Sequence, residues 1–300
     1  MSFSRLLLLG AAAASIAACG SSSDVTVVTP DPAALVRFVN AVPDTGFMDF
    51  RFTDAVEGVP STPFVNLPFR GGFDRAYQRV NVGTHHIRVF MGSANTIRIK
   101  NPATPNLPLD SIDISNVPSI VSTVMGDTTF TFALGVHYTF VFYGSARAGA
   151  QKFVILTDNI AASPSGNFSL RAANLNTTAQ DVYVNTSTTP LPAVGGSPGY
   201  PNVAPLTATS YINVPVAAAN SNYAVSAADA GTTAPVASTV MPVGTAAVAE
   251  VPGVSAALAA TAGSRVGGVF TAYIFPASTA GSKAASFPTP GVVLQADKQP

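Results

Sequence analysis

The chain has 300 residues, of which 47% are hydrophobic and only 10% are charged, against roughly 25% charged residues in an average soluble protein. This length accommodates two domains of ordinary size. The 15 basic residues are balanced by 15 acidic ones, so the chain lacks the cationic excess on which electrostatic binding of nucleic acid depends. The single cysteine excludes an intramolecular disulfide and an all-cysteine metal site.

The N-terminus has the pattern of a secretory signal peptide. Arg5 is the only charged residue before an apolar run over residues 6–14, and small residues follow this run. The run is too short to cross a bilayer as a helix, which takes about 20 residues. We therefore predict a signal peptide over residues 1–18.

The single cysteine lies at the end of this signal, and Ile16-Ala17-Ala18-Cys19 resembles the lipobox of bacterial lipoproteins. The resemblance implies that Cys19 is acylated and attaches the protein to a membrane of the cell envelope. Gly20 implies the outer membrane, with the body on the periplasmic or the surface side. Residues 19–34 are then the lipidated cysteine and a flexible tether, because they show no periodicity. The alternative is an ordinary secretory signal in which the cysteine has no role.

The rest of the chain contains an internal repeat. Strand-like segments in the first part of the chain are echoed in the same order at nearly one offset, 134 residues for several of them. The paired segments are residues 36–40 and 170–174, 49–52 and 181–184, 77–82 and 211–216, 138–142 and 270–274, and 153–156 and 292–294. This pattern predicts two copies of one domain, residues 35–160 and 165–300.

Each copy has the sequence pattern of a β-sandwich. Phenylalanine recurs at every second position in residues 50–52, 130–132 and 140–142. The residues that alternate with these phenylalanines, Thr139 and Val141 among them, are predicted to face outward. Gly and Pro turns separate the runs, which predicts an antiparallel immunoglobulin-like sandwich for each copy. Residues 254–260 are predicted to be a strand, because their equivalents in copy one, 128–134, are strand-like.

The start of copy one resembles a known bacterial family. Residues 35–41, followed by Pro43-Asp44 and by Asp49-Phe50-Arg51-Phe52, are similar to the opening of the family called domain of unknown function 4397. Residues 80–89 resemble its second half, and copy two resembles the family less closely. The resemblance implies tandem immunoglobulin-like sandwiches in a secreted or lipid-anchored protein, and it implies no activity.

A serine-hydrolase pattern occurs at Gly195-Gly196-Ser197-Pro198-Gly199. In the hydrolase elbow, the residue after the serine donates its backbone N–H to the oxyanion. Pro198 has no N–H, and no histidine follows Ser197. We therefore predict that the protein is not an enzyme.

The candidate metal ligands are His85, His86, His137 and the acidic turns with Asp44, Asp49, Asp110 and Asp113. His85 and His86 are adjacent on a predicted strand, so their side chains point to opposite faces. The acidic residues are too sparse for a calcium loop, and turn hydrogen bonding explains them. We predict neither a metal nor a cofactor.

Copy one is locally basic, whereas copy two has few charged residues. Arg70, Arg75 and Arg79 form a candidate patch for an anionic glycan or a lipid headgroup, and solvated strand faces are the plain alternative. The absence of tryptophan weakens the case for a sugar-stacking platform.

Together these features favour a lipid-anchored envelope protein that acts as a non-catalytic binding or structural module. Its partners are then the membrane, through the acylated Cys19, and a glycan or an envelope protein, without nucleic acid. The first alternative is a carbohydrate- or cell-wall-binding module that uses the basic loops of copy one. The second is an enzyme with a cryptic site formed by His137 and an aspartate.

Overall fold

The computed structural model describes residues 32–54, 64, 67–71, 77–91, 98–99, 110–111, 124–216, 222–241 and 266–298. Within these ranges every regular element is a β-strand and no helix occurs, so the all-β prediction is confirmed. In this part of the chain, no helix is long and apolar enough to cross a membrane. The predicted signal peptide, Cys19, most of the tether and the strand predicted over residues 254–260 lie outside the described residues.

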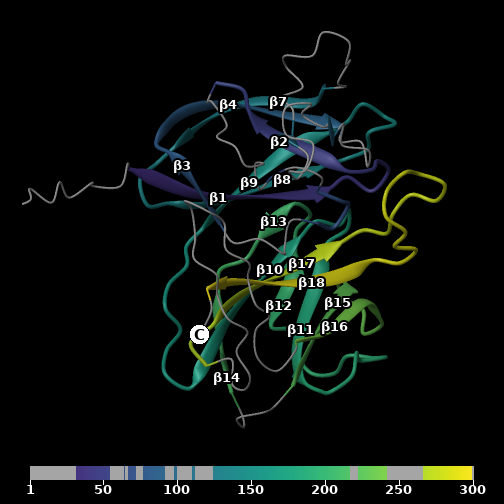
Figure 1. Cartoon of the computed structure of the whole chain (residues 1–300). Helices are drawn as coiled ribbons and strands as arrows, with labels where there is room; N and C mark the ends of the chain where they lie inside the picture. The colour runs from purple at the N-terminus through teal and green to yellow at the C-terminus, as the bar shows by residue number, and fades with distance from the viewer. Residues whose placement is uncertain are drawn as a thin grey trace, which may run out of the picture. The chain divides into compact units, whose positions relative to one another are not determined.

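Strands β1 to β9 form the first half of the body (Figure 1). They are β1 (Ala33–Ala41), β2 (Met48–Phe52), β3 (Gln78–Asn81), β4 (Gly83–Met91), β5 (Arg98–Ile99), β6 (Asp110–Ser111), β7 (Val124–Phe132), β8 (His137–Tyr143) and β9 (Lys152–Asp158). One sheet has the order β3-β1-β8-β9 and a second has the order β2-β4-β7, while β5 pairs with β6.

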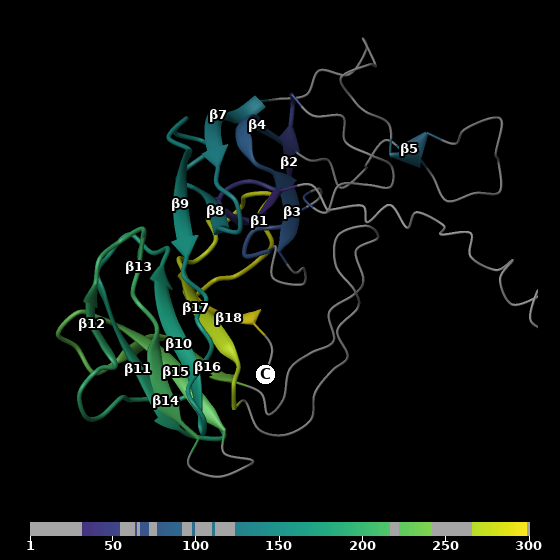
Figure 2. The ribbon, with the colours of Figure 1, turned by 90° about the vertical axis from the view of Figure 1, so that its left-hand side faces the viewer.

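Strands β10 to β18 form the second half (Figure 2). They are β10 (Asn167–Asn174), β11 (Gln180–Thr186), β12 (Tyr200–Val203), β13 (Thr207–Ala208), β14 (Ile212–Pro215), β15 (Tyr223–Asp229), β16 (Pro235–Met241), β17 (Val269–Phe275) and β18 (Gly291–Lys298). One sheet has the order β13-β10-β17-β18, with β14 also paired to β10, and the other has the order β12-β11-β15-β16.

The two halves use the same strand pairing. β1 pairs with both β3 and β8, and β10 pairs with both β14 and β17. The β1–β8 and β10–β17 pairs are parallel, and the other pairs between described strands are antiparallel. The predicted antiparallel sandwich is thus confirmed except at one pair in each half. Side-chain alternation indicates that a segment is a strand, but not which strand it pairs with or in which direction. No hairpin joins β1 to β8 or β10 to β17, so no short turn sets their relative direction.

Each half has its own hydrophobic core between its two sheets. In the first half the core is built from phenylalanines, as the alternation predicts, and the rings of Phe38 and Phe50 stack with centroids 4.7 Å apart. In the second half the core contains Ala172 and Ala272 together with tyrosine and valine side chains. Burial of these apolar faces is the main contribution to the stability of each sandwich.

A third buried cluster joins the two halves. Thr139 and Val141 face away from the core of their own half, as predicted, but both are 0% exposed. Val141 packs in one cluster with Ala173 and Tyr273 of the second half. The outward-facing residues of β8 are therefore covered by the second half rather than by water.

Candidate functional site

Two arginines lie at equivalent places in the two halves and are almost completely buried. Arg37 on β1 and Arg171 on β10 are each only 2% exposed. In β1 the neighbours Val36 and Phe38 point into the core of the first half, so Arg37 points to the opposite face of the sheet. Arg171 lies in the same way between Leu170 and Ala172. A buried guanidinium needs charged and hydrogen-bonding partners, because its desolvation is costly.

Each arginine has a matching threonine on the parallel neighbour strand. Arg37 Nε donates to Thr139 Oγ1 at 2.8 Å, and Arg171 Nε donates to Thr271 Oγ1 at 2.8 Å. Thr139 and Thr271 in turn donate to an aspartate on the last strand of the same half, Asp158 and Asp297 respectively. Both halves thus hold the same chain of side-chain contacts from arginine to threonine to aspartate.

A tyrosine completes the set in each half. Tyr77 donates its hydroxyl to Asp158 at 2.6 Å, and Tyr211 donates to Asp297 at 2.8 Å. The guanidinium of Arg37 lies over the Tyr77 ring at 4.4 Å, and that of Arg171 lies over the Tyr211 ring at 4.9 Å.

The ion pairs cross between the halves. Arg37 Nη2 contacts Asp297 Oδ1 at 2.5 Å, and Arg171 Nη2 donates to Asp158 Oδ1. Both aspartate side chains are 0% exposed. Each half therefore offers its arginine to the other half's aspartate, as in the self-complementary interface of a twofold dimer. We call these eight residues the interface network: Arg37, Tyr77, Thr139, Asp158, Arg171, Tyr211, Thr271 and Asp297.

The charges within the network set its protonation. Burial alone would lower the pKa of Arg171, but the negative charge of Asp158 raises it well above its usual value. The pKa of Arg37 is likewise raised by its tyrosine and aspartate neighbours against the effect of burial. Burial also raises the pKa of Tyr273, whose hydroxyl accepts from Arg37 at 2.6 Å, to about 12. Both arginines therefore stay charged and the tyrosine hydroxyls stay neutral at pH 7.

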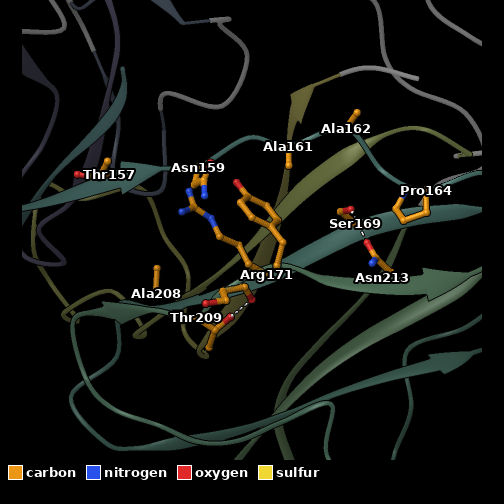
Figure 3. Close-up of a pocket in the computed structure, with 12 residues that line it drawn as sticks. Thr157, Asn159, Ala161, Ala162, Pro164, Ser169, Arg171, Ala208, Thr209 and Asn213 are labelled. Atoms are coloured by element: carbon orange, nitrogen blue, oxygen red, sulfur yellow. Dashed lines mark hydrogen bonds between the residues drawn. The ribbon is translucent and has the colours of Figure 1, made fainter. Parts of the chain in front are cut away.

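A polar pocket of about 520 Å³ lies beside the network in the second half (Figure 3). It is lined by Thr157, Asn159, Ala161, Ala162, Pro164, Ser169, Arg171, Ala208, Thr209, Ser210, Tyr211 and Asn213. The stretch from residue 159 to residue 164, which links β9 to β10, forms one wall, and β10, β13, β14 and the segment between β13 and β14 supply most of the rest. Figure 3 shows the Arg171 side chain extending from β10 toward Asn159 of the linker.

Hydrogen bonds fix the floor of the pocket. Ser169 Oγ donates to Asn213 Oδ1 at 3.0 Å and lies 2.6 Å from Ser163 Oγ. Ala172 N donates to Thr209 Oγ1 at 3.1 Å. The side chains of Thr157, Asn159 and Ser210 and the amide nitrogen of Asn213 have no hydrogen-bond partner in the described part of the chain. These groups are available to a ligand.

The structure separates the predicted arginine patch. Arg70 donates from Nη2 to the carbonyl oxygens of Pro276 and Thr289, each at 2.6 Å, and its guanidinium lies over the Phe287 ring at 4.4 Å. Burial lowers its pKa to about 10. Arg79 is exposed on β3, and Arg75 lies outside the described residues, as does Cys19. Arg70 thus contributes to the contact with the second half.

The candidate metal ligands belong to separate contacts. His85 Nδ1 lies 3.2 Å from Asp54, and His86 contacts Asp127. No group of three metal-ligating side chains occurs among the residues that the structure places. Asp44 caps the turn after β8, where it accepts hydrogen bonds from Ser145 Oγ at 2.6 Å and from two backbone N–H groups.

Two further candidates remain to be placed. Asp110 lies on β6, and Asp113 falls outside the described residues. Ser197 lies in the loop between β11 and β12.

Sequence reasoning missed the interface network, although the signal was present. Arg37 and Arg171 both interrupt apolar strand segments, and Tyr77 and Tyr211 recur at the same offset of 134 residues. A charged residue that interrupts the apolar residues of a strand in both halves indicates a buried ion pair.

Comparisons with known proteins give one family. No curated protein matches the chain. A solved structure described as "Alpha-glucan binding by a streptococcal virulence factor" is similar over 70% of this chain and 88% of that chain, with 10% identity. Its TM-score is 0.19, so the likeness carries no argument about function. The model of the family described as "Domain of unknown function (DUF4397)" matches residues 34–185, just over half of the chain. The chain therefore belongs to the DUF4397 family.

Proposed function

We propose that the protein is a lipid-anchored component of the bacterial cell envelope whose body is a non-catalytic binding or structural module. The observation that supports the non-catalytic part of this proposal is the interface network. Its buried charged groups are the kind of perturbed residues that mark an active site in many enzymes. Here each of them bonds to another member of the network, so they join two sandwiches into one body.

The proposal includes a second copy of the family domain in the second half. The shared strand pairing supports it, because Arg37 and Arg171 have the same neighbours in register: Thr139 and Thr271. The family match ends at residue 185, within β11.

The cryptic-enzyme alternative finds little support in the geometry. His137 lies near Asp158, and its ring contacts that of Tyr77 with centroids 5.0 Å apart. Asp158 already accepts from Arg171, Thr139 and Tyr77. Among the described residues, no hydrogen bond joins Asp158 to the His137 side chain, as a histidine base would need.

The anchor is tested with the Cys19→Ala variant in the native host. Wild-type protein is expected to incorporate radiolabelled palmitate and to fractionate with membranes, whereas the variant is expected to do neither. Proteinase K treatment of intact cells then separates a surface from a periplasmic body. A variant that fractionates with membranes like wild type would overturn the anchor.

A further inference from the structure

The pocket breaks the symmetry between the halves. β3 and β14 are equivalent strands, and the register places Leu35 opposite Arg79 in the first half and Ser169 opposite Asn213 in the second. The leucine and arginine side chains of the first half thus correspond to a serine hydroxyl and an asparagine amide in the second half. The linker between β9 and β10 covers this polar pair in the second half. The pocket thus has a polar pair in its wall at a register position where the first half has leucine and arginine.

The charges around the pocket indicate a neutral ligand. Arg171 is the only charged residue among those that line it, and Asp158 neutralises its guanidinium. The second ion pair, Arg37 with Asp297, leaves the whole network without net charge. An anionic ligand would need a cation without a carboxylate partner, which this wall does not offer.

The polar groups indicate a ligand rich in hydroxyls. Amides and hydroxyls of Asn159, Ser210, Thr157 and Asn213 offer both donors and acceptors without protein partners among the described residues. Alanine and proline side chains on the linker wall supply small apolar contacts. The volume of about 520 Å³ lies within the range of roughly 300–1,000 Å³ that is typical of small-ligand pockets.

The walls are rigid before any ligand arrives. Arg171 is held by Thr271 and Asp158, and Ser169 is held between Asn213 and Ser163. A preformed pocket reduces the ordering cost of binding. We propose that this pocket binds a short segment of a neutral polysaccharide, with Asn213 and Asn159 bonding to sugar hydroxyls. This inference rests on the proposed function and names its ligand class.

The test uses the full chain carrying Cys19→Ala, titrated by calorimetry with four trisaccharides: maltotriose, cellotriose, chitotriose and trigalacturonate. At least one of the three neutral sugars is expected to bind. Asn213→Trp fills the pocket and is expected to weaken that binding at least tenfold. The matched control is Arg79→Trp, which places the same side chain at the equivalent register position on β3, and is expected to leave affinity unchanged.

Three results would overturn the inference. They are the absence of binding by every neutral trisaccharide, tighter binding of trigalacturonate than of any neutral one, and equal losses from the two tryptophan variants. The melting temperature of each variant shows whether a loss reflects unfolding. Chromatography of the sugar after incubation keeps the two proposals apart: cleavage of a bound trisaccharide would contradict the non-catalytic function while leaving the pocket in place.

Discussion

The two halves share an interface and differ in their cores. At matching positions the network has arginine, threonine, aspartate and tyrosine in both halves. In the cores, Phe38 and Phe140 of the first half, which face each other across the parallel pair, correspond to Ala172 and Ala272 of the second. The charged network is thus the same in the two halves, whereas other buried positions differ, including Val39 and Val141 of the contact, which correspond to Ala173 and Tyr273.

The second half fills its core with other side chains at equivalent places. Phe64 and Leu67, which bond to the backbone of β2, are buried in the first core. Tyr200 and Val203 of β12, which pairs with β11, are buried in the second core. The two cores thus differ in residue type at positions that pair in the same way. A sandwich core accepts such exchanges where the total volume is kept, whereas a buried ion pair requires both partners.

The largest expected effect comes from breaking the shared interface. Arg171→Met leaves Asp158 buried without its ion-pair partner, so the free energy of unfolding should fall by about 3–5 kcal/mol. Arg37→Met should cause a similar loss through Asp297, because the two ion pairs are equivalent. Chemical denaturation measures both.

The control for these variants is an exposed ion pair. Arg88→Met removes a contact with Asp127 at 2.8 Å, and such surface pairs contribute at most about 1 kcal/mol. The double variant Arg171→Met/Asp158→Leu should recover much of the single loss, because no unpaired charge remains. If Arg171→Met cost no more than Arg88→Met, the network would not hold the halves together.

The difference between the two cores is tested by exchanging the side chains at one equivalent position. Phe140→Ala opens a cavity among phenylalanines and should lower the free energy of unfolding by about 3–5 kcal/mol. Ala272→Phe overfills the space occupied by Tyr200 and its neighbours and should cost about 1–3 kcal/mol. A stabilising Ala272→Phe would show that β12 leaves the second core underfilled.

The smallest expected effect is a dependence of stability on pH that arises from His137 in the first half. Burial lowers the pKa of His137, with Asp158 and Asp297 opposing and Arg37 reinforcing this shift. Its counterpart in register is Val269. Below about pH 6.5 the unfolded state binds a proton that the folded state resists. Stability is therefore lost as pH falls through this value.

His137→Val gives the first half the residue of the second and should reduce this loss. The measurement is the difference in melting temperature between pH 7.5 and pH 5.5 for each protein. Equal differences in the two proteins would assign the pH dependence to other groups.

Much of the fold was predictable because strands and turns leave local patterns. The alternation over residues 140–142 and the echo of residues 36–40 in residues 170–174 identify strands that the structure contains. The contact between the halves was not predictable in this way, because alternation shows that Thr139 faces outward but not what covers it. Arg70 illustrates the limit, since its carbonyl partners lie more than 200 residues away in the chain.

The position of β1 also determines how the body responds to mechanical load. The described chain begins at residue 32 and runs at once into β1, whose residues Leu35 to Ala41 pair in parallel with β8 while β3 holds its other edge. A pull along this strand loads these backbone hydrogen bonds together, in shear, rather than one after another. From the same strand, the Arg37 side chain donates a hydrogen bond to Asp297 of the second half. Force applied through the N-terminus therefore meets the strongest resistance at the first strand, before it reaches either core.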